Sequence, residues 1–279
     1  MTSPSRPLAL EDPALTNDPI ELLVRRLRLT CELSDADVRA LHSLPFHIKD
    51  FPARTPINRE RDRLSHSCLV VSGLLCRAKM AGDGRRQLLS FHIPGDIPDL
   101  QSLHLEVMDH DLIALSDAQV ALIAHDDIRR VTTEHPDLAA ALWRDTLIDG
   151  SVFREWIVNV GRRDATQRMM HLLYEVGFRL KAMGLGEIGS FHMPITQVDL
   201  ADALGLTPVH VNRVLQGLRK DGVLDFRRSI VTMNDVERVA AMSAFDPLYL
   251  HYESARDERP HDPPEAEADR PAASPQGNA

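Results

Sequence analysis

The sequence predicts an α+β protein: an antiparallel, jelly-roll-like β-roll, then one long helix, then a small domain of helices with a two-stranded wing. Three observations predict this order. Short apolar runs alternate with turn residues about every ten positions in the first half of the chain, which is typical of antiparallel β-structure. A long helical stretch that is apolar on more than one face follows. Beyond it, two short helical segments meet at a glycine.

Length and composition exclude several classes of protein. With 279 residues, of which 43% are hydrophobic, the chain suits about two domains and can bury a core, which excludes wholesale disorder. No apolar run approaches the roughly 18 residues of a membrane span, and no signal peptide follows residues 1–7. The three cysteines contain no CxxC pair. They fit a reducing cytoplasm and argue against a disulfide framework or a four-cysteine metal centre.

The two ends of the chain are predicted to be disordered. Residues 1–17 are rich in proline and serine, and residues 253–279 are acidic with almost no apolar side chains. The alternative for the acidic tail is a regulatory segment. Residues 237–252 are expected to form a short extension between the last domain and this tail.

Two short helices are expected before the β-structure. Asp18 can cap a helix over residues 18–30, with Pro19 at its first helical position. Ser34 can cap a second helix, which ends before Pro45. Both caps are local signals, so we expect the helices to begin at these positions.

The strands of the β-roll are predicted from apolar runs and from the turns between them. The runs over residues 68–75 and 87–93 predict strands. Turn residues at 81–84 predict a hairpin between these strands, and residues 94–96 predict another turn. With the helices before them, these strands are expected to form a first domain over residues 18–130.

A long helix is predicted from about residue 126 to residue 159, with a break near Pro136. Its second part carries apolar residues for two stripes, of which one can face the first domain and the other a second copy of the chain. We therefore expect residues 131–162 to form a dimerisation helix. The interface residues expected are Leu142, Val152, Trp156 and Val160. The alternative is one helix buried inside a monomer.

Residues 194–233 carry the strongest local signal. Thr196 can cap a short helix with Asp199 at its third position, which approximates a capping box. Gly205 lies where the chain must turn with a positive φ. Thr207 then caps a second helix, in which Pro208 takes the first position. This helix, short glycine turn and second helix predict a helix-turn-helix within a domain over residues 163–236.

Charge and the wing favour DNA as the ligand of this domain. The whole chain carries a net charge of −9, but 11 basic and 8 acidic residues give residues 151–233 a net charge of +3. The second helix contains no acidic residue, and residues 222–232 predict a two-stranded wing with Arg227 and Arg228 at its tip. Polar and small side chains face outward early in the second helix: Thr207, Val209, His210, Asn212 and Arg213. The alternative is a pair of helices that only pack together.

The chain resembles the Crp/Fnr family of bacterial transcription regulators over roughly residues 20–240. The matching segments are Val71–Gly73, Gly95–Asp96, Ile195–Gln197, Leu204–Thr207 and Val211–Arg213. The resemblance implies a cyclic-nucleotide-binding-like sensor domain, a dimerisation helix and a winged helix-turn-helix. It also implies a cytoplasmic homodimer that binds palindromic DNA with half-sites about one helical turn apart, with RNA polymerase as a partner. It does not imply an enzyme.

The resemblance assigns DNA contacts to individual residues. Three fall where the family touches phosphates: Thr196, Gln197 and Thr207. Arg213 falls on the arginine that reads guanine, and Arg228 falls near a basic wing residue that contacts phosphate. The family often has Arg-Glu or Val-Glu where this chain has Pro208–Val209. We therefore expect Val209 or His210 to read a base edge instead, for example through a thymine methyl group.

The first domain departs from the cyclic-AMP-binding members of the family. These members place a glutamate for the ribose after the Gly-Asp turn, and then an arginine for the cyclic phosphate. Here Gly95–Asp96 lacks the glutamate, and no arginine or lysine occurs from residue 87 to residue 127. Asp109 and Asp111 would repel a phosphate. We therefore expect neither cyclic AMP nor an iron–sulfur cluster as a cofactor.

Other inputs and one other class of protein remain open. A haem, a small molecule or a redox signal through one of the three cysteines, Cys31, Cys68 and Cys76, would suit the fold, although Cys68 and Cys76 are expected in the core as small hydrophobes. A cupin-like metalloenzyme would use the cluster His92, His104, Glu106 and His110. An interaction module that has lost DNA binding is the third hypothesis.

Overall fold

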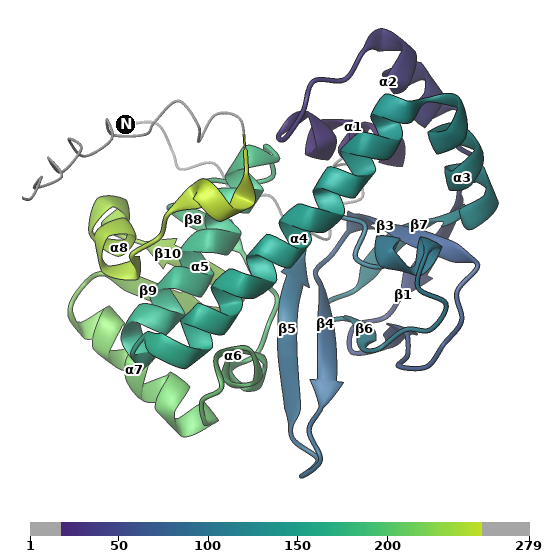
Figure 1. Ribbon diagram of the computed structural model, residues 1–279. Coiled ribbons are helices and arrows are strands. Elements are labelled where there is room, and N and C mark those ends of the chain that lie inside the picture. The colour runs from purple at the N-terminus through teal and green to yellow at the C-terminus, as the bar shows by residue number, and fades with distance from the viewer. Residues whose placement is uncertain (1–17, 253–279) are drawn as a thin grey trace, which may run out of the picture.

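The computed structural model describes residues 18–252 and has the predicted α+β architecture (Figure 1). The two tails expected to be disordered, 1–17 and 253–279, lie outside the described residues. Within the described part, no helix is long and apolar enough to cross a membrane. Figure 1 shows the chain as two bodies, with one long helix, α4, running between them.

The first body, here called the β-domain, is an antiparallel roll of two sheets flanked by helices. Its helices are α1 (Pro19–Arg28), α2 (Asp35–His42), η2 (Leu100–Leu103) and α3 (His125–Glu134). Its strands are β1 (His47–Phe51), β2 (Pro56–Asn58), β3 (His66–Ser72), β4 (Leu75–Met80), β5 (Arg86–His92), β6 (Asp111–Ala114) and β7 (Ala118–Ala124). One sheet has the order β1-β7-β3 and the other the order β2-β6-β4-β5.

The local signals at the start of the β-domain are confirmed. Asp18 caps α1 by accepting a hydrogen bond from the Ile20 amide at 2.9 Å. Ser34 and Asp37 form a reciprocal capping box at the start of α2. Cys68 and Cys76 are fully buried in the core, as expected for small hydrophobes. The hairpin expected at residues 81–84 connects β4 to β5.

The turn at Gly95 brings the β-domain against two helices from elsewhere in the chain. Gly95 has a φ of +100°, and a Cβ atom there would lie 2.6 Å from Met183 Cε and 3.1 Å from the Leu22 carbonyl oxygen. Only glycine combines this backbone conformation with so close an approach. The turn therefore sits where α1 meets the end of α5, the helix after α4.

The long helix is divided as the proline predicted. α3 ends at Glu134, and α4 (Pro136–Arg162) begins at the proline and continues for 27 residues. One face of α4 packs against the β-domain and against α5 through buried residues such as Leu138 and Ile148.

The assignment of Val152 and Trp156 to a dimer interface is wrong, because both side chains are buried inside the protomer. The Trp156 ring packs edge-on against Phe91 of β5 at 5.6 Å between centroids. Its indole N–H donates to the Glu175 carboxylate on α5 at 3.2 Å. The hydrogen bond to Glu175 therefore satisfies the indole N–H of the buried tryptophan. Leu142 and Val160 are half-buried.

The opposite face of α4 carries exposed apolar side chains. Trp143 and Ile157 are each 68% exposed, Leu147 is 58% exposed and Val158 is 44% exposed. Leu147, Ile157 and Val158 lie 4, 14 and 15 positions after Trp143, which at 3.6 residues per turn places all four on one side of the helix. An open groove along α4 includes Trp143, Leu147 and His251.

The second body is a winged helical domain. It contains α5 (Ala165–Ala182), β8 (Ser190–His192), α6 (Gln197–Leu204), α7 (Pro208–Lys220), β9 (Leu224–Arg227) and β10 (Ile230–Met233), with the sheet order β8-β10-β9. The extension expected at residues 237–252 contains α8 (Val236–Ser243) and η3 (Pro247–Leu250). It packs back on α5, where the Tyr249 hydroxyl donates to Glu175 at 2.7 Å, and Tyr252 is buried.

Candidate functional site

α6 and α7 form the predicted helix-turn-helix, and local hydrogen bonds fix both helix starts. The Thr196 hydroxyl accepts from the Asp199 amide at 3.2 Å, while the Asp199 carboxylate accepts from the Thr196 amide at 2.8 Å. Gly205 ends α6 with a φ of +62°, the left-handed conformation that the turn requires. Thr207 caps α7 by accepting from the His210 amide at 3.2 Å. These bonds and the glycine fix where α6 begins, where it ends and where α7 begins.

α7 buries one face and exposes Val209 and Arg213 on the other, where base reading was expected. Its inner face is buried through Val211, Val214, Leu215 and Leu218. On the outer face, Val209 is 71% exposed. Arg213 is exposed and forms no ion pair with any described residue. A protruding helix with one free arginine and one exposed apolar side chain can contact base edges in a major groove.

The wing also carries one free cation. Arg228 and Ser229 form the turn between β9 and β10 with φ values of 51° and 62°, which match a tight hairpin turn. Arg227 pairs with Asp225 at 3.0 Å. Arg228 is exposed and has no ion-pair partner within the described range. Of the two wing arginines, Arg228 is therefore the one available to a phosphate.

A row of hydrogen-bonded side-chain amides joins the two helices. Its last member, Gln216, is not among the residues predicted from the sequence. Asn212 donates from Nδ2 to Gln197 Oε1 at 3.2 Å. Gln216 in turn donates from Nε2 to Asn212 Oδ1 at 2.8 Å. The spacing of four between residues 212 and 216 is the signal that could have found this pair. These two hydrogen bonds orient the Gln197 amide at the start of α6.

The nine residues predicted to touch DNA lie on the helix-turn-helix and the wing. The exposed ones are Thr196, Gln197, Thr207, Pro208, Val209, Arg213 and Arg228, and the half-buried ones are His210 and Asn212. All of them except Arg228 lie on α6, on α7 or at the caps of these two helices. Arg228 lies apart from them at the wing tip. No contact with DNA is tested by this placement, so their roles stay predictions.

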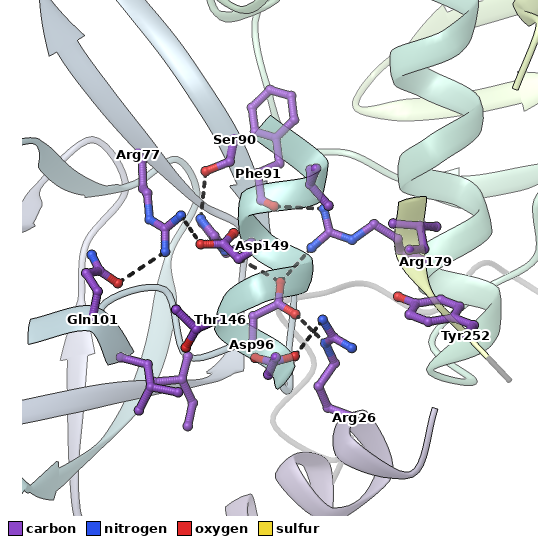
Figure 2. Close-up of a pocket in the computed structure, with 16 residues that line it drawn as sticks. Arg26, Arg77, Ser90, Phe91, Asp96, Gln101, Thr146, Asp149, Arg179 and Tyr252 are labelled. Atoms are coloured by element: carbon purple, nitrogen blue, oxygen red, sulfur yellow. Dashed lines mark hydrogen bonds and ion pairs between the residues drawn. The ribbon is translucent and has the colours of Figure 1, made fainter. Parts of the chain in front are cut away.

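A second candidate site is a small polar cavity between the β-domain, α4 and α5. Asp96, from the Gly-Asp turn, accepts from Arg26 of α1 at 3.1 Å and from Arg179 of α5 at 2.7 Å. Arg77 of β4 crosses the cavity, donates to the Pro98 carbonyl and pairs with Asp149 of α4 at 2.5 Å. Figure 2 shows these two clusters on either side of the cavity.

Burial and charge set the protonation of this cavity. Burial alone raises the pKa of Asp96, but Arg179, the adjacent His92 and Arg26 together outweigh burial and hold its pKa well below the usual range. Burial and the nearby Arg77 lower the pKa of His92 to about 4, so the imidazole is neutral at pH 7. Three arginines face three aspartates here: Arg26, Arg77 and Arg179 against Asp96, Asp145 and Asp149. The lining is therefore balanced in charge.

The residues considered for a ligand or a metal do not converge. Asp109 is exposed and pairs with its neighbour His110 at 2.6 Å, and Glu106 pairs with Arg63 at 2.7 Å. His92 bonds to Ser90 instead. Among the described residues, no group of three or more histidine, cysteine or acidic side chains could hold a metal ion. The cupin-like interpretation therefore loses its proposed ligand cluster.

The buried cysteines are poor candidates for reactive thiols. Burial raises the pKa of Cys76 to about 12, and burial with the nearby Asp99 raises the pKa of Cys68 well above its usual range. Because the thiolate is the reactive form, both groups remain protonated and unreactive at pH 7.

Comparisons with known proteins agree with this geometry. Residues 48–135 match the cyclic nucleotide-binding domain model, and residues 167–242 match the Crp-like helix-turn-helix domain model. The chain is 25% identical over 202 residues to the transcriptional activator protein FnrL of Cereibacter sphaeroides, covering 71% of this chain and 81% of FnrL. It is 26% identical over 222 residues to the nitrogen fixation regulation protein FixK of Bradyrhizobium diazoefficiens, covering 79% of this chain and 92% of FixK.

Solved structures give the same architecture. The structure of FixK2 from Bradyrhizobium japonicum superposes with a TM-score of 0.65 at 25% identity, covering 72% of this chain and 99% of that one. A regulator of Xanthomonas campestris described as c-di-GMP-responsive, CLP, superposes with a TM-score of 0.57 at 17% identity, covering 72% of this chain and 99% of that one. The second likeness concerns the fold alone.

Proposed function

The chain belongs to the Crp/Fnr family of transcription regulators, and we propose that it binds a palindromic DNA site as a cytoplasmic homodimer without cyclic AMP. The observation that carries this proposal is the capped α6–α7 pair, with Val209 and Arg213 exposed on α7 and Arg228 free on the wing. Arg213 reads a guanine in each half-site, while Arg228 contacts the backbone. RNA polymerase is the protein partner at the promoter.

The outer face of α4 supports the homodimer. Its exposed apolar residues, Trp143, Leu147, Ile157 and Val158, form a long stripe that a monomer leaves in water. A twofold-related copy of the same helix would cover the same stripe on both partners. Such a dimer carries two α7 helices, and a palindrome matches them.

The small cavity supports regulation without cyclic AMP. Its volume is about 30 Å³, room for about two water molecules, whereas small-molecule sites usually measure about 300–1,000 Å³. Arg77 fills the space beside the segment after the Gly-Asp turn and is itself held by Asp149. A ligand there would have to displace an ion pair whose arginine is buried.

Selection of bound sequences from random duplex DNA tests the proposal. The purified full-length protein should enrich a palindrome with half-sites about one helical turn apart, and cyclic AMP should leave the enrichment unchanged. Enrichment of a single half-site would contradict the homodimer. Absence of any enrichment would favour the interaction module that has lost DNA binding.

A further inference from the structure

Two arginines of the β-domain reach across to the first helix of the helix-turn-helix. Arg54, in the loop between β1 and β2, donates to both oxygens of Asp199 at 2.7 Å. Arg86, the first residue of β5, donates to Asp199 and to Asp202 at 2.8 Å each. These four residues are here called the α6 latch. Figure 1 shows α6 beside the β5 strand, where the latch lies.

Asp199 does two jobs in this arrangement. Its side chain is 1% exposed, and the same carboxylate that caps α6 through Thr196 also receives both arginines. Burial alone raises the pKa of Asp199, but the hydrogen bonds from Thr196 and the Arg54 charge together lower it. The carboxylate that pairs with the β-domain is therefore also part of the α6 cap. Thr196 and Gln197 are expected to contact phosphates at this same cap.

The loop that carries Arg54 has an uncommon backbone. Arg54 has a φ of +68°, a conformation that few residues other than glycine adopt. Its amide donates to the Ala114 carbonyl at 2.7 Å, and the Ala53 amide donates to Asp117 at 2.8 Å. The fold thus holds the loop in the one shape that directs Arg54 at α6, and such outliers tend to serve function.

The two arginines also neutralise the two aspartates of α6. Without the arginines, the two carboxylates of Asp199 and Asp202 would repel approaching phosphates. A further contact, from Gln87 Nε2 to the Ala203 carbonyl at 3.3 Å, holds the other end of α6. The β-domain therefore holds α6 at both ends and neutralises its acids.

We propose that Arg54 and Arg86 are positioning residues for DNA binding, which hold and neutralise the start of α6 through Asp199 and Asp202. The inference rests on the proposed DNA binding, and it assigns the β-domain a direct hold on the helix-turn-helix. The arginines act through Asp199 and Asp202, not by touching DNA. Control of DNA affinity by the β-domain then needs only a shift of the β1–β2 loop or of β5.

Charge-removing variants of the full-length protein test this role. Arg54→Gln with Arg86→Gln should weaken cognate binding about tenfold, within the range of about 5–150-fold typical of coupling between sites. Arg85→Gln is the matched control, because it removes the same kind of charge one position from Arg86. Arg85 is 86% exposed and pairs only with Asp83 among the described residues. It should change affinity less than about twofold.

Two further readouts separate positioning from direct contact and from misfolding. The salt dependence of cognate binding should keep its slope in the double variant, because no phosphate contact is lost. Hydrogen exchange of residues 197–204 should become faster in the double variant and stay unchanged in Arg85→Gln. The charge swap Arg86→Asp with Asp202→Arg should recover much of the affinity that Arg86→Asp alone loses.

The outcomes are distinguishable. An affinity of the double variant within twofold of the wild type would overturn the inference, as would a slope that falls by about one per arginine lost, which marks direct phosphate contacts. Failure of the charge swap to restore any affinity would also count against it. A wild-type protein that selects no DNA sequence refutes the proposed function itself, before any variant is compared.

Discussion

Replacing Leu147 with aspartate should break the homodimer. Full burial of a leucine side chain contributes about 1.5–3 kcal/mol, and Leu147 leaves 58% of its surface exposed in the protomer. Covering that surface therefore contributes about 1–2 kcal/mol per copy, or about 2–4 kcal/mol per twofold dimer, to which both copies contribute. At 1.4 kcal/mol per tenfold change, the dimer dissociation constant should rise about 30-fold to 700-fold. Burying the new carboxylate adds to the loss.

Sedimentation equilibrium over a range of concentrations measures this constant directly. Leu105→Asp is the matched control, because Leu105 is 59% exposed and lies in the loop between η2 and β6, outside α4. The control should dimerise like the wild type, and at concentrations low enough for all three proteins to be monomeric, both variants should unfold at the wild-type temperature. Equal dissociation constants for Leu147→Asp and the wild type would refute the assignment of this face.

Four further predictions concern DNA, pH and cyclic AMP. Arg213→Ala should cost about 1–3 kcal/mol on cognate DNA and relax one base pair per half-site; equal losses on scrambled DNA would contradict base reading. Arg228→Ala should weaken both duplexes alike and lower the salt slope by about one per contact. Burial and Arg163 lower the pKa of His171 to about 4, against about 6.5 unfolded, so only the unfolded state binds this proton between those values. Urea unfolding should therefore show stability falling as pH drops from about 6.5 to 4, and less steeply in His171→Gln. Calorimetric titration with cyclic AMP should give no binding heat, and a micromolar site would disprove that expectation.

The local parts of the helix-turn-helix could be predicted from the sequence. The caps at Thr196 and Thr207 and the turn at Gly205 depend on residues within a few positions of one another, so spacing alone identifies them. The break before α4 follows in the same way from Pro136. In each case the residue type itself favours the local structure at its position.

The orientation of α4 could not be predicted, because both of its stripes are apolar. The inward stripe packs on residues distant in the sequence: Trp156 contacts Phe91 of β5, and Glu175 of α5, 19 positions away, accepts its indole N–H. Hydrophobic periodicity shows which residues form an apolar stripe, but it does not show what that stripe packs against. The same limit hid the α6 latch, in which Arg54 and Asp199 are 145 positions apart, and no periodic pattern marks an isolated arginine.

Burial distinguishes the ion pairs around Asp96 from those of the α6 latch. Around Asp96, the charges of Arg26 and Arg179 are each less than a tenth exposed, and removing one partner from such a buried cluster leaves another charge unpaired at high cost. The arginines of the α6 latch are 41% and 26% exposed, so water can replace their bonds and salt weakens them. Breaking the ion pairs of the latch therefore costs less than breaking those around Asp96. Because buried apolar residues of β4, β5 and α6 pack together beside the latch, loss of its arginines should loosen α6 without separating it from the β-domain.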